Sequence, residues 1–301
     1  MNILITIGLM MASCALIAGT TLLAKALGTG FGAAVDGMAL SPFQVTFGRY
    51  VFALATLLVV MAALRPRFTR PALRIHGLRA FCGWSGVTAM FAASALIPLA
   101  DAVAITFLNP IFTMLFAVLF LGEAVGPRRW GAAALCFAGA LLLIRPGLSS
   151  FQPLGLIALA AALILGFEAM VVKFLSNREG TLQILFWSNL LGSMFAALSV
   201  GFVWVTPTAL QWGAMAAIGV MMVGAQALFL LALRRGDVSF VSPLFYGTLI
   251  FAAVYDLVFF GVIPQALSLL GITVILTGAI LLGLSEHRRA RALSPGGTVI
   301  K

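Results

Sequence analysis

The sequence predicts an all-α integral membrane protein whose ten transmembrane helices form two inverted five-helix repeats. Apolar residues fill 62% of the 301 positions and charged residues only 9%, whereas soluble domains carry about 25% charge. The apolar residues lie in long runs without the alternation of a membrane β-barrel, and about 20 of them are needed for a helix to cross a bilayer. An internal similarity between the two halves of the chain predicts the repeat.

Charged and turn-forming residues divide the chain into ten apolar segments, joined mostly by short connections. The longest connection, residues 28–42, is rich in glycine, and a basic tail follows the last segment at 286–301. The predicted spans are residues 3–26, 42–64, 76–97, 100–121, 128–145, 153–175, 181–204, 209–233, 238–261 and 265–284.

Basic residues indicate which ends of the spans face the cytoplasm. If the N-terminus is cytoplasmic, 15 Lys and Arg, among them Arg79, fall on inner connections and 2, Lys25 and Arg145, on the outer side. Because cytoplasmic loops are enriched in basic residues, we expect both termini in the cytoplasm. The membrane is expected to be the inner (plasma) membrane of the cell. The basic loops predict contact with anionic lipids and not with nucleic acid, because no groove combines basic and aromatic residues.

Matching segments 139 residues apart indicate a duplication. CFAGALLLI (136–144) resembles ILTGAILLG (275–283), and ALIAGTTLLAK (15–25) resembles ALILGFEAMVVK (162–173). The repeats are therefore expected at 1–147 and 148–285. Because five spans is an odd number, the second copy must be upside down relative to the first, as in many secondary transporters.

The fourth and ninth spans end alike except for one acid. VLFLGEAV (118–125) contains Gly122 and Glu123, whereas LVFFGVIP (257–264) has Gly261 followed by Val262. We interpret Glu123 as a partner of the nearby Arg128 and Arg129 at the cytoplasmic end of the fourth span. Within that span, Pro110 removes a backbone hydrogen bond and so predicts a kink; simple packing is the alternative.

These features together resemble one family. The LGE ending of the fourth span (121–123), the GALLLI run of the fifth (139–144), the FGRY of the second (47–50) and the two five-span halves are similar to the EamA family of the drug/metabolite transporter superfamily. The resemblance implies export of amino acids or other small metabolites by alternating access. Among subtypes, the chain is most similar to YddG-type exporters of aromatic amino acids.

Three ionisable residues inside predicted spans are candidates for function, since such groups are costly in a membrane. Arg49 and Asp256 lie at similar depths from the outer face, which predicts a pair or a shared polar network; the alternative for Arg49 is contact with outer headgroups. Glu168 occurs in only one repeat, so it is a candidate for binding a substrate ammonium or a proton. The alternative is an acid that faces a wet inner vestibule.

Aromatic and amide side chains inside the spans are candidates for the wall of a substrate cavity, where apolar surface is combined with a few polar groups. Packing and helix-to-helix hydrogen bonding are the alternatives. The candidates are Trp84, Trp187, Tyr246, Tyr255, Asn109, Asn189 and Gln226.

Other classes of function fit the sequence less well. The two histidines, His76 and His287, are far apart, and the chain has no HExxH, GxSxG or Walker A motif, so we expect neither an enzyme, a metal site nor a cofactor. A channel-like uniporter and a transporter of another metabolite or a drug-like cation stay open. Oligomeric state is not readable from the sequence.

Overall fold

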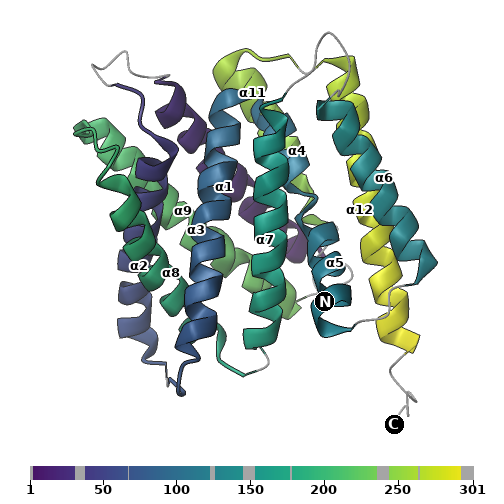
Figure 1. Cartoon of the computed structure of the whole chain (residues 1–301), viewed down its shortest axis with the longest axis horizontal. Helices are drawn as coiled ribbons and strands as arrows, with labels where there is room; N and C mark the ends of the chain where they lie inside the picture. The colour runs from purple at the N-terminus through teal and green to yellow at the C-terminus, as the bar shows by residue number, and fades with distance from the viewer. Residues whose placement is uncertain are drawn as a thin grey trace.

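A computed structural model describes residues 3–30, 38–66, 68–122, 126–144, 153–176, 178–235, 244–263 and 265–292. Most of these residues form helices that run side by side (Figure 1). The helices are α1 (Ile3–Thr29), α2 (Pro42–Leu64), α3 (Leu73–Leu96), α4 (Leu99–Thr106), α5 (Asn109–Leu121), α6 (Pro127–Ile144), α7 (Gly155–Ser176), α8 (Thr181–Val200), α9 (Ala209–Arg235), α11 (Gly247–Phe260) and α12 (Ala266–Ala292).

The helices confirm the predicted spans. In the described part of the chain, 6 helical stretches have the length and apolar composition to cross a membrane, and one of them, Leu99–Phe120, joins α4 to α5. Shorter apolar helices lie at Trp130–Leu143, Gly247–Phe260 and Ala266–Gly278. The helix α3 is less apolar because its first turns carry Arg74, His76 and Arg79.

The fourth span is broken, not merely kinked, at the position where the sequence predicts a bend. The helix α4 ends at Thr106 and α5 begins at Asn109, with Pro110 in its first turn, where a missing N–H costs nothing. In the ninth span, α11 likewise begins only at Gly247, although Leu249 stands where Pro110 does in the first repeat. The interruption is therefore common to both repeats and does not depend on a proline at that position.

The two breaks meet in the middle of the molecule. The ring of Phe107, between α4 and α5, packs against Phe245 and Tyr246 at centroid distances of 5.5 and 5.4 Å. Aromatic rings at these spacings are in favourable contact. The interrupted helices of the two halves thus contact each other through the residues at their interruptions.

Equivalent glycines confirm that the halves share one local structure. Gly122 and Gly261 end α5 and α11 with φ values of +65° and +64°, the left-handed conformation that glycine adopts without a Cβ penalty. The expected partner of Gly122, Glu123, lies outside the described residues, as do the side chains of Arg128 and Arg129.

Two glutamines form matching contacts at the starts of α2 and α8. The side chain of Gln44 donates to Val205 O (2.5 Å) and accepts from Val205 N (3.2 Å). The side chain of Gln183, 139 residues later, donates to Thr69 O (3.1 Å) and accepts from Thr69 N (2.8 Å). Each amide satisfies both backbone groups of one residue in the connection that follows the facing helix, so the same device recurs in both repeats.

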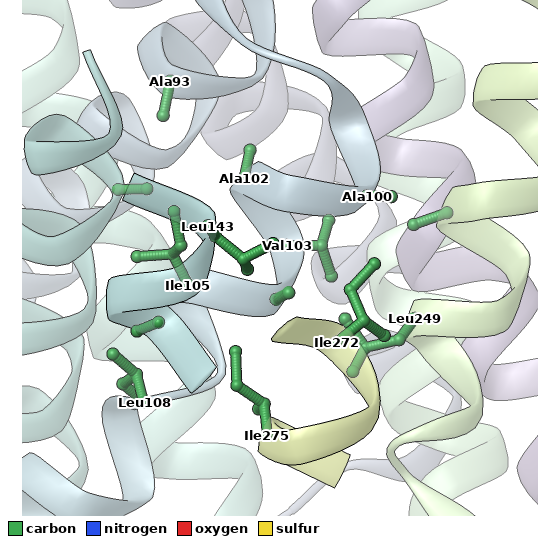
Figure 2. Close-up of a cluster of buried hydrophobic side chains, with 14 of the residues drawn as sticks. Ala93, Ala100, Ala102, Val103, Ile105, Leu108, Leu143, Leu249, Ile272 and Ile275 are labelled. Atoms are coloured by element: carbon green, nitrogen blue, oxygen red, sulfur yellow. The ribbon is translucent and has the colours of Figure 1, made fainter. Parts of the chain in front are cut away.

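The main hydrophobic core surrounds α4 (Figure 2). All eight residues of α4 are buried, and four of them are alanine or threonine, which let neighbouring helices approach closely. Leu143 of α6, Leu249 of α11, and Ile272 and Ile275 of α12 belong to the same buried cluster. The first and second repeats are therefore joined by apolar packing around a short helix.

The contact between α6 and α12 depends on glycines at equivalent positions. A Cβ on Gly139 would lie 2.8 Å from Gly271 O, and one on Gly278 would lie 2.9 Å from Ala132 O. These neighbours are backbone atoms, so they move only together with the whole helix. The two helices can pack this closely only while both positions lack a side chain.

We predict that Gly139→Ala and Gly278→Ala each destabilise the protein by about 1–3 kcal/mol, because overpacking forces backbone shifts. Thermal unfolding in detergent measures the effect. The matched control is Gly131→Ala, also on α6, where a Cβ meets nothing within 4 Å. Equal behaviour of all three variants would contradict the assigned packing.

Candidate functional site

A polar cluster lies where α2, α3, α7 and α8 meet. Arg79 of α3 places Nε 3.3 Å from Oε1 of Glu168 on α7, and its Nη1 donates a 2.9 Å hydrogen bond to Ile184 O on α8. The Arg79 side chain is 9% exposed and that of Glu168 19% exposed. A buried ion pair therefore ties helices of both repeats together, with the Glu168 side chain partly exposed.

Tyr50 enters the cluster because two glycines make room for it. Its hydroxyl would lie 3.2 Å from a Cβ on Gly83, and the Glu168 Oε1 would lie 3.4 Å from the same atom. A Cβ on Gly192 would overlap the Tyr50 ring. The tyrosine is 3% exposed, so its ring fills the space between α2, α3 and α8 and its hydroxyl lies beside the ion pair.

Arg49 adds a second positive charge next to Tyr50. Its guanidinium stacks over the Tyr50 ring at 4.6 Å, a favourable cation–π geometry. Arg49 and Arg79 both interact electrostatically with Glu168, so two cationic side chains surround one acid. The alternative for Arg49, contact with outer headgroups, stays a prediction.

Five buried side-chain nitrogens near these helices lack a hydrogen-bond partner in the described part of the protein. They are Arg49 Nη1, His76 Nδ1, Arg79 Nε, Trp84 Nε1 and Trp187 Nε1. Buried donors without partners are rare in folded proteins, and leaving one unsatisfied costs about 1–3 kcal/mol. An acceptor-rich ligand, such as a carboxylate, is one way to satisfy them.

The two tryptophans lie in separate aromatic groups. Trp84 packs near Phe43 and Phe195 at 6.2 and 6.3 Å, whereas Trp187 packs near His76 and Phe186 at 6.2 and 5.5 Å. The two indole rings therefore do not face each other across one aromatic cavity. Their role in substrate binding stays a prediction.

The predicted link between Arg49 and Asp256 is wrong. Asp256 Oδ1 accepts a 2.5 Å hydrogen bond from Lys25 Nζ, and Oδ2 accepts one of 3.1 Å from Ala100 N at the start of α4. Similar depth did not place the two residues together, because α11 packs against α1 and α4 while α2 packs against α8 and α9. Lys25, counted at first as an outer basic residue, is a buried partner inside α1.

Of the other candidate residues, the two tyrosines contact another element of the fold. Tyr255 donates to Ala15 O on α1 (3.3 Å), Asn189 donates to Leu185 O on its own helix (2.9 Å), and Tyr246 packs on Phe107. Asn109 opens α5, and Gln226 lies half-buried on α9. None of these contacts tests a role in binding substrate.

A second buried network of hydrogen bonds is centred on Glu179, in the connection between α7 and α8. Glu179 accepts from Ala72 N (2.9 Å), lies 2.8 Å from His76 Nε2, and accepts from Gln183 Nε2. Burial opposes ionisation of Glu179, but the hydrogen bonds from Ala72, His76 and Gln183 outweigh it and hold its pKa below the usual range. The connection after α2 is thereby bound to the start of α8.

Sequence reasoning missed several of these residues. Arg79 was counted with the inner loops although it lies within a predicted span, and its position there was the available signal. The sequence offered no signal for Glu179, because its partner lies 103 residues away. Asp101 carried the same signal as Arg79, since it lies within the predicted span at 100–121.

Comparison with known proteins identifies the family. The model of the EamA-like transporter family matches the chain twice, at residues 4–145 and 153–284. The chain belongs to this family. It is therefore a multi-pass membrane protein with the two-repeat transporter fold, built from ten spans.

The similar relatives move different small molecules. A riboflavin transporter of Rhizobium johnstonii is 31% identical over 72% of this chain and 72% of its own length. An S-adenosylmethionine uptake transporter of Rickettsia bellii is 26% identical over 84% and 87% of the two chains. The pseudopaline exporter of Pseudomonas aeruginosa is 26% identical over 81% and 86%.

A solved crystal structure shares the fold. It superposes with a TM-score of 0.59 over 91% of this chain and 98% of the other, at 22% identity. Together with the family match, the relatives make this chain a membrane transporter of a small molecule. They name no aromatic amino acid exporter, so that subtype stays a prediction.

We predict that Arg79→Met destabilises the protein by about 3 kcal/mol, at the lower end for a broken buried pair because Glu168 is partly exposed. Adding Glu168→Gln in the same chain should recover most of the loss, since the carboxylate that Arg79 had paired is then removed as well. Thermal unfolding of the single and double variants measures the difference. A double variant as unstable as Arg79→Met would show that the Glu168 charge is not the cause.

The Glu179 network predicts a loss of stability in acid. A carboxyl whose pKa is lowered on folding stabilises the fold above its unfolded pKa, about 4.3 for glutamate, and this contribution disappears as pH falls through the lower folded value. Between neutral pH and about pH 3, the unfolding temperature should fall more steeply for the unmodified protein than for Glu179→Gln. Parallel curves would contradict the assignment.

Proposed function

We propose that this transporter exports amino acids, with aromatic ones favoured, by alternating access. The observation that carries the proposal is the cluster of Arg49, Tyr50, Arg79 and Glu168 between helices of the two repeats. It offers a cation over one aromatic ring and an anion near the hydroxyl of the same ring. An amino acid with an apolar side chain has a carboxylate for the cation, an ammonium for the anion and an apolar surface for the ring.

The substrate carboxylate is assigned to Arg49. Its Nη1 is buried without a described acceptor, and an arginine fork matches a carboxylate well. The substrate ammonium is assigned to the partly exposed Glu168, which Arg79 contacts at Oε1. Two cationic side chains around one acid favour a ligand with at least one negative group.

The inverted repeat and the paired breaks support alternating access. In transporters of this kind, substrate sites lie near the midplane at the interface of the repeats, beside discontinuous helices. Here the breaks at Phe107 and Tyr246 contact each other. The two halves can exchange conformations around such a centre, which a channel-like uniporter does not require.

Riboflavin is the second candidate substrate. The relative that supports it is the 31% identical riboflavin transporter, and the unpaired indole N–H groups of Trp84 and Trp187 match the acceptor-rich ring of that molecule. A different metabolite or a drug-like cation stays open, although a cation would meet the two cationic side chains.

The proposed orientation places both termini in the cytoplasm, in the inner membrane. In Figure 1 the described end of α12 lies in the lower half of the view, as does the connection between α2 and α3. That connection carries Arg65 and Arg70, which supports contact with anionic lipids at the cytoplasmic face. The proposed repeats are 1–147 and 148–285, followed by a basic tail at 286–301.

Flux through purified protein in liposomes tests the function. Labelled phenylalanine, tryptophan, threonine, riboflavin and a quaternary cation are measured by counterflow, which needs no imposed gradient of any ion. We expect phenylalanine and tryptophan to move fastest. Saturable movement of riboflavin alone would replace the amino acid proposal by the second candidate.

We predict that Arg49→Gln lowers the affinity for phenylalanine about tenfold or more, because a hydrogen bond to a charged group is worth about 1.5–3 kcal/mol. Concentration dependence of counterflow should show the loss mainly in KM. Arg74→Gln is the matched control, because Arg74 is exposed at the start of α3. An equal effect of both variants would remove Arg49 from the proposed site.

A further inference from the structure

Two sets of hydrogen bonds hold α2 and α8 together, one at each end of this helix pair. Gln44, at the start of α2, binds both backbone groups of Val205, which lies beyond the end of α8. Gln183, at the start of α8, binds both backbone groups of Thr69, which lies beyond the end of α2. The two helices are therefore antiparallel neighbours that are tied at both ends.

The tie at the end predicted to face outside consists of neutral groups, among the residues that the structure describes. Besides the bonds of Gln44, the side chain of Gln211 on α9 donates from Nε2 to Met38 O (2.9 Å) in the connection before α2. Leu40, two residues before α2, is buried and apolar. We call the set of Gln44, Val205, Gln211 and Met38 the Gln44 clamp.

The tie at the end predicted to face the cytoplasm contains a carboxylate as well. Glu179 lies two residues before α8, the place that Leu40 takes before α2. It accepts from Ala72 N and from Gln183 Nε2, and lies 2.8 Å from His76 Nε2. Hydrogen bonds to an ionised group are about twice as strong as those between neutral groups. We call this stronger set the Gln183 clamp; its members are Gln183, Thr69, Glu179, Ala72 and His76.

The proposed transport site lies between the two clamps. Arg49 lies within about two turns of the start of α2. Arg79 places Nε beside Glu168, and its Nη1 donates to Ile184 O, directly after Gln183. A solute that reaches this site along α2 and α8 therefore has to pass one of the clamps.

We propose that the two clamps are the gates of the transporter, that they open one at a time, and that the weaker Gln44 clamp opens more often. This inference rests on the proposed alternating access. When α2 and α8 separate at one end, the hydrogen bonds at the other end hold them together and serve as the hinge. The protein therefore rests with its predicted cytoplasmic end closed.

Two buried residues at equivalent places report the opening of each end. Val45 follows Gln44 and is 1% exposed, and Ile184 follows Gln183 and is 5% exposed. In a chain whose three cysteines are replaced by alanine, Val45→Cys and Ile184→Cys are introduced separately and labelled in detergent with a bulky polar maleimide. Each rate is divided by that of the same cysteine in unfolded protein. We expect Val45→Cys to be labelled faster.

Weakening one clamp should speed labelling at its own end only. Glu179→Gln removes the charge of the Gln183 clamp and should speed labelling of Ile184→Cys about tenfold, because loss of a hydrogen bond to a charged group changes an equilibrium by about this factor. It should not speed labelling of Val45→Cys. Gln44→Ala should have the converse effect.

The matched control for Glu179→Gln is Arg178→Gln. Arg178 is the preceding residue, but its guanidinium stacks on the ring of Phe174 on α7, at 4.3 Å, and not on a member of the clamp. This variant should change neither labelling rate.

A chain with both reporter cysteines tests whether the gates exclude each other. A maleimide adduct does not fit at the buried position of Val45, so it holds that end open once it has formed. Intact-mass spectrometry then measures the fractions of protein with no, one and two adducts. If only one gate opens at a time, the doubly labelled fraction should lie several-fold below the product of the two single-site fractions.

A doubly labelled fraction equal to that product would overturn the proposal, because the two ends would then open independently. Faster labelling of both reporters in Glu179→Gln, or of Ile184→Cys than of Val45→Cys in the unmodified clamps, would also overturn it. The chain with two cysteines keeps both clamps intact, so the test stands if Glu179→Gln does not fold. Absence of counterflow for every solute would instead contradict the proposed substrates and leave the labelling result valid.

Discussion

The absence of water in the bilayer core is the constraint on which the rest of this structure depends. Each backbone polar group must be satisfied within the protein, which explains why the described spans are helices and why their breaks occur where the two halves cover each other. Each buried charge must likewise find a partner. Lys25 with Asp256, and Arg79 with Glu168, meet this requirement between helices that are far apart in the chain. Each ion pair therefore links two helices that are neighbours in the fold.

The duplication produces equal local structure at opposite ends of the molecule. Gly122 and Gly261 end helices in the same way, and Gln44 and Gln183 bind the same kind of backbone group. Function is expected where the copies differ, because symmetric residues can only serve both ends alike. The Arg49 position corresponds to Ser188 in the second half, and the acids at 168 and 256 are likewise present in one copy. The two charged clusters therefore break the symmetry of the fold.

The candidate site was predicted in part. Arg49, Glu168 and Asp256 were found because charge inside an apolar run stands out in any membrane sequence. Their partners were not found, because depth along a helix can be counted from the sequence but the direction in which a side chain points relative to other helices cannot. Arg79 and Lys25 lie near the ends of their apolar runs, where a basic residue is also typical of a loop or headgroup contact. Only the packing of α3 on α7, and of α1 on α11, distinguishes these cases.

By itself, the sequence determined the class of protein, the ten spans, the inverted repeat and the glycines that end α5 and α11, because each depends on local composition and on periodicity within one segment. Tertiary structure decided which charges pair, that the breaks at Phe107 and Tyr246 touch, and that Gln44 and Gln183 tie opposite ends of α2 and α8. These features depend on the rotation and contact of helices separated by more than a hundred residues. No local pattern carries that information, since many arrangements of ten apolar helices satisfy the same hydrophobic requirement.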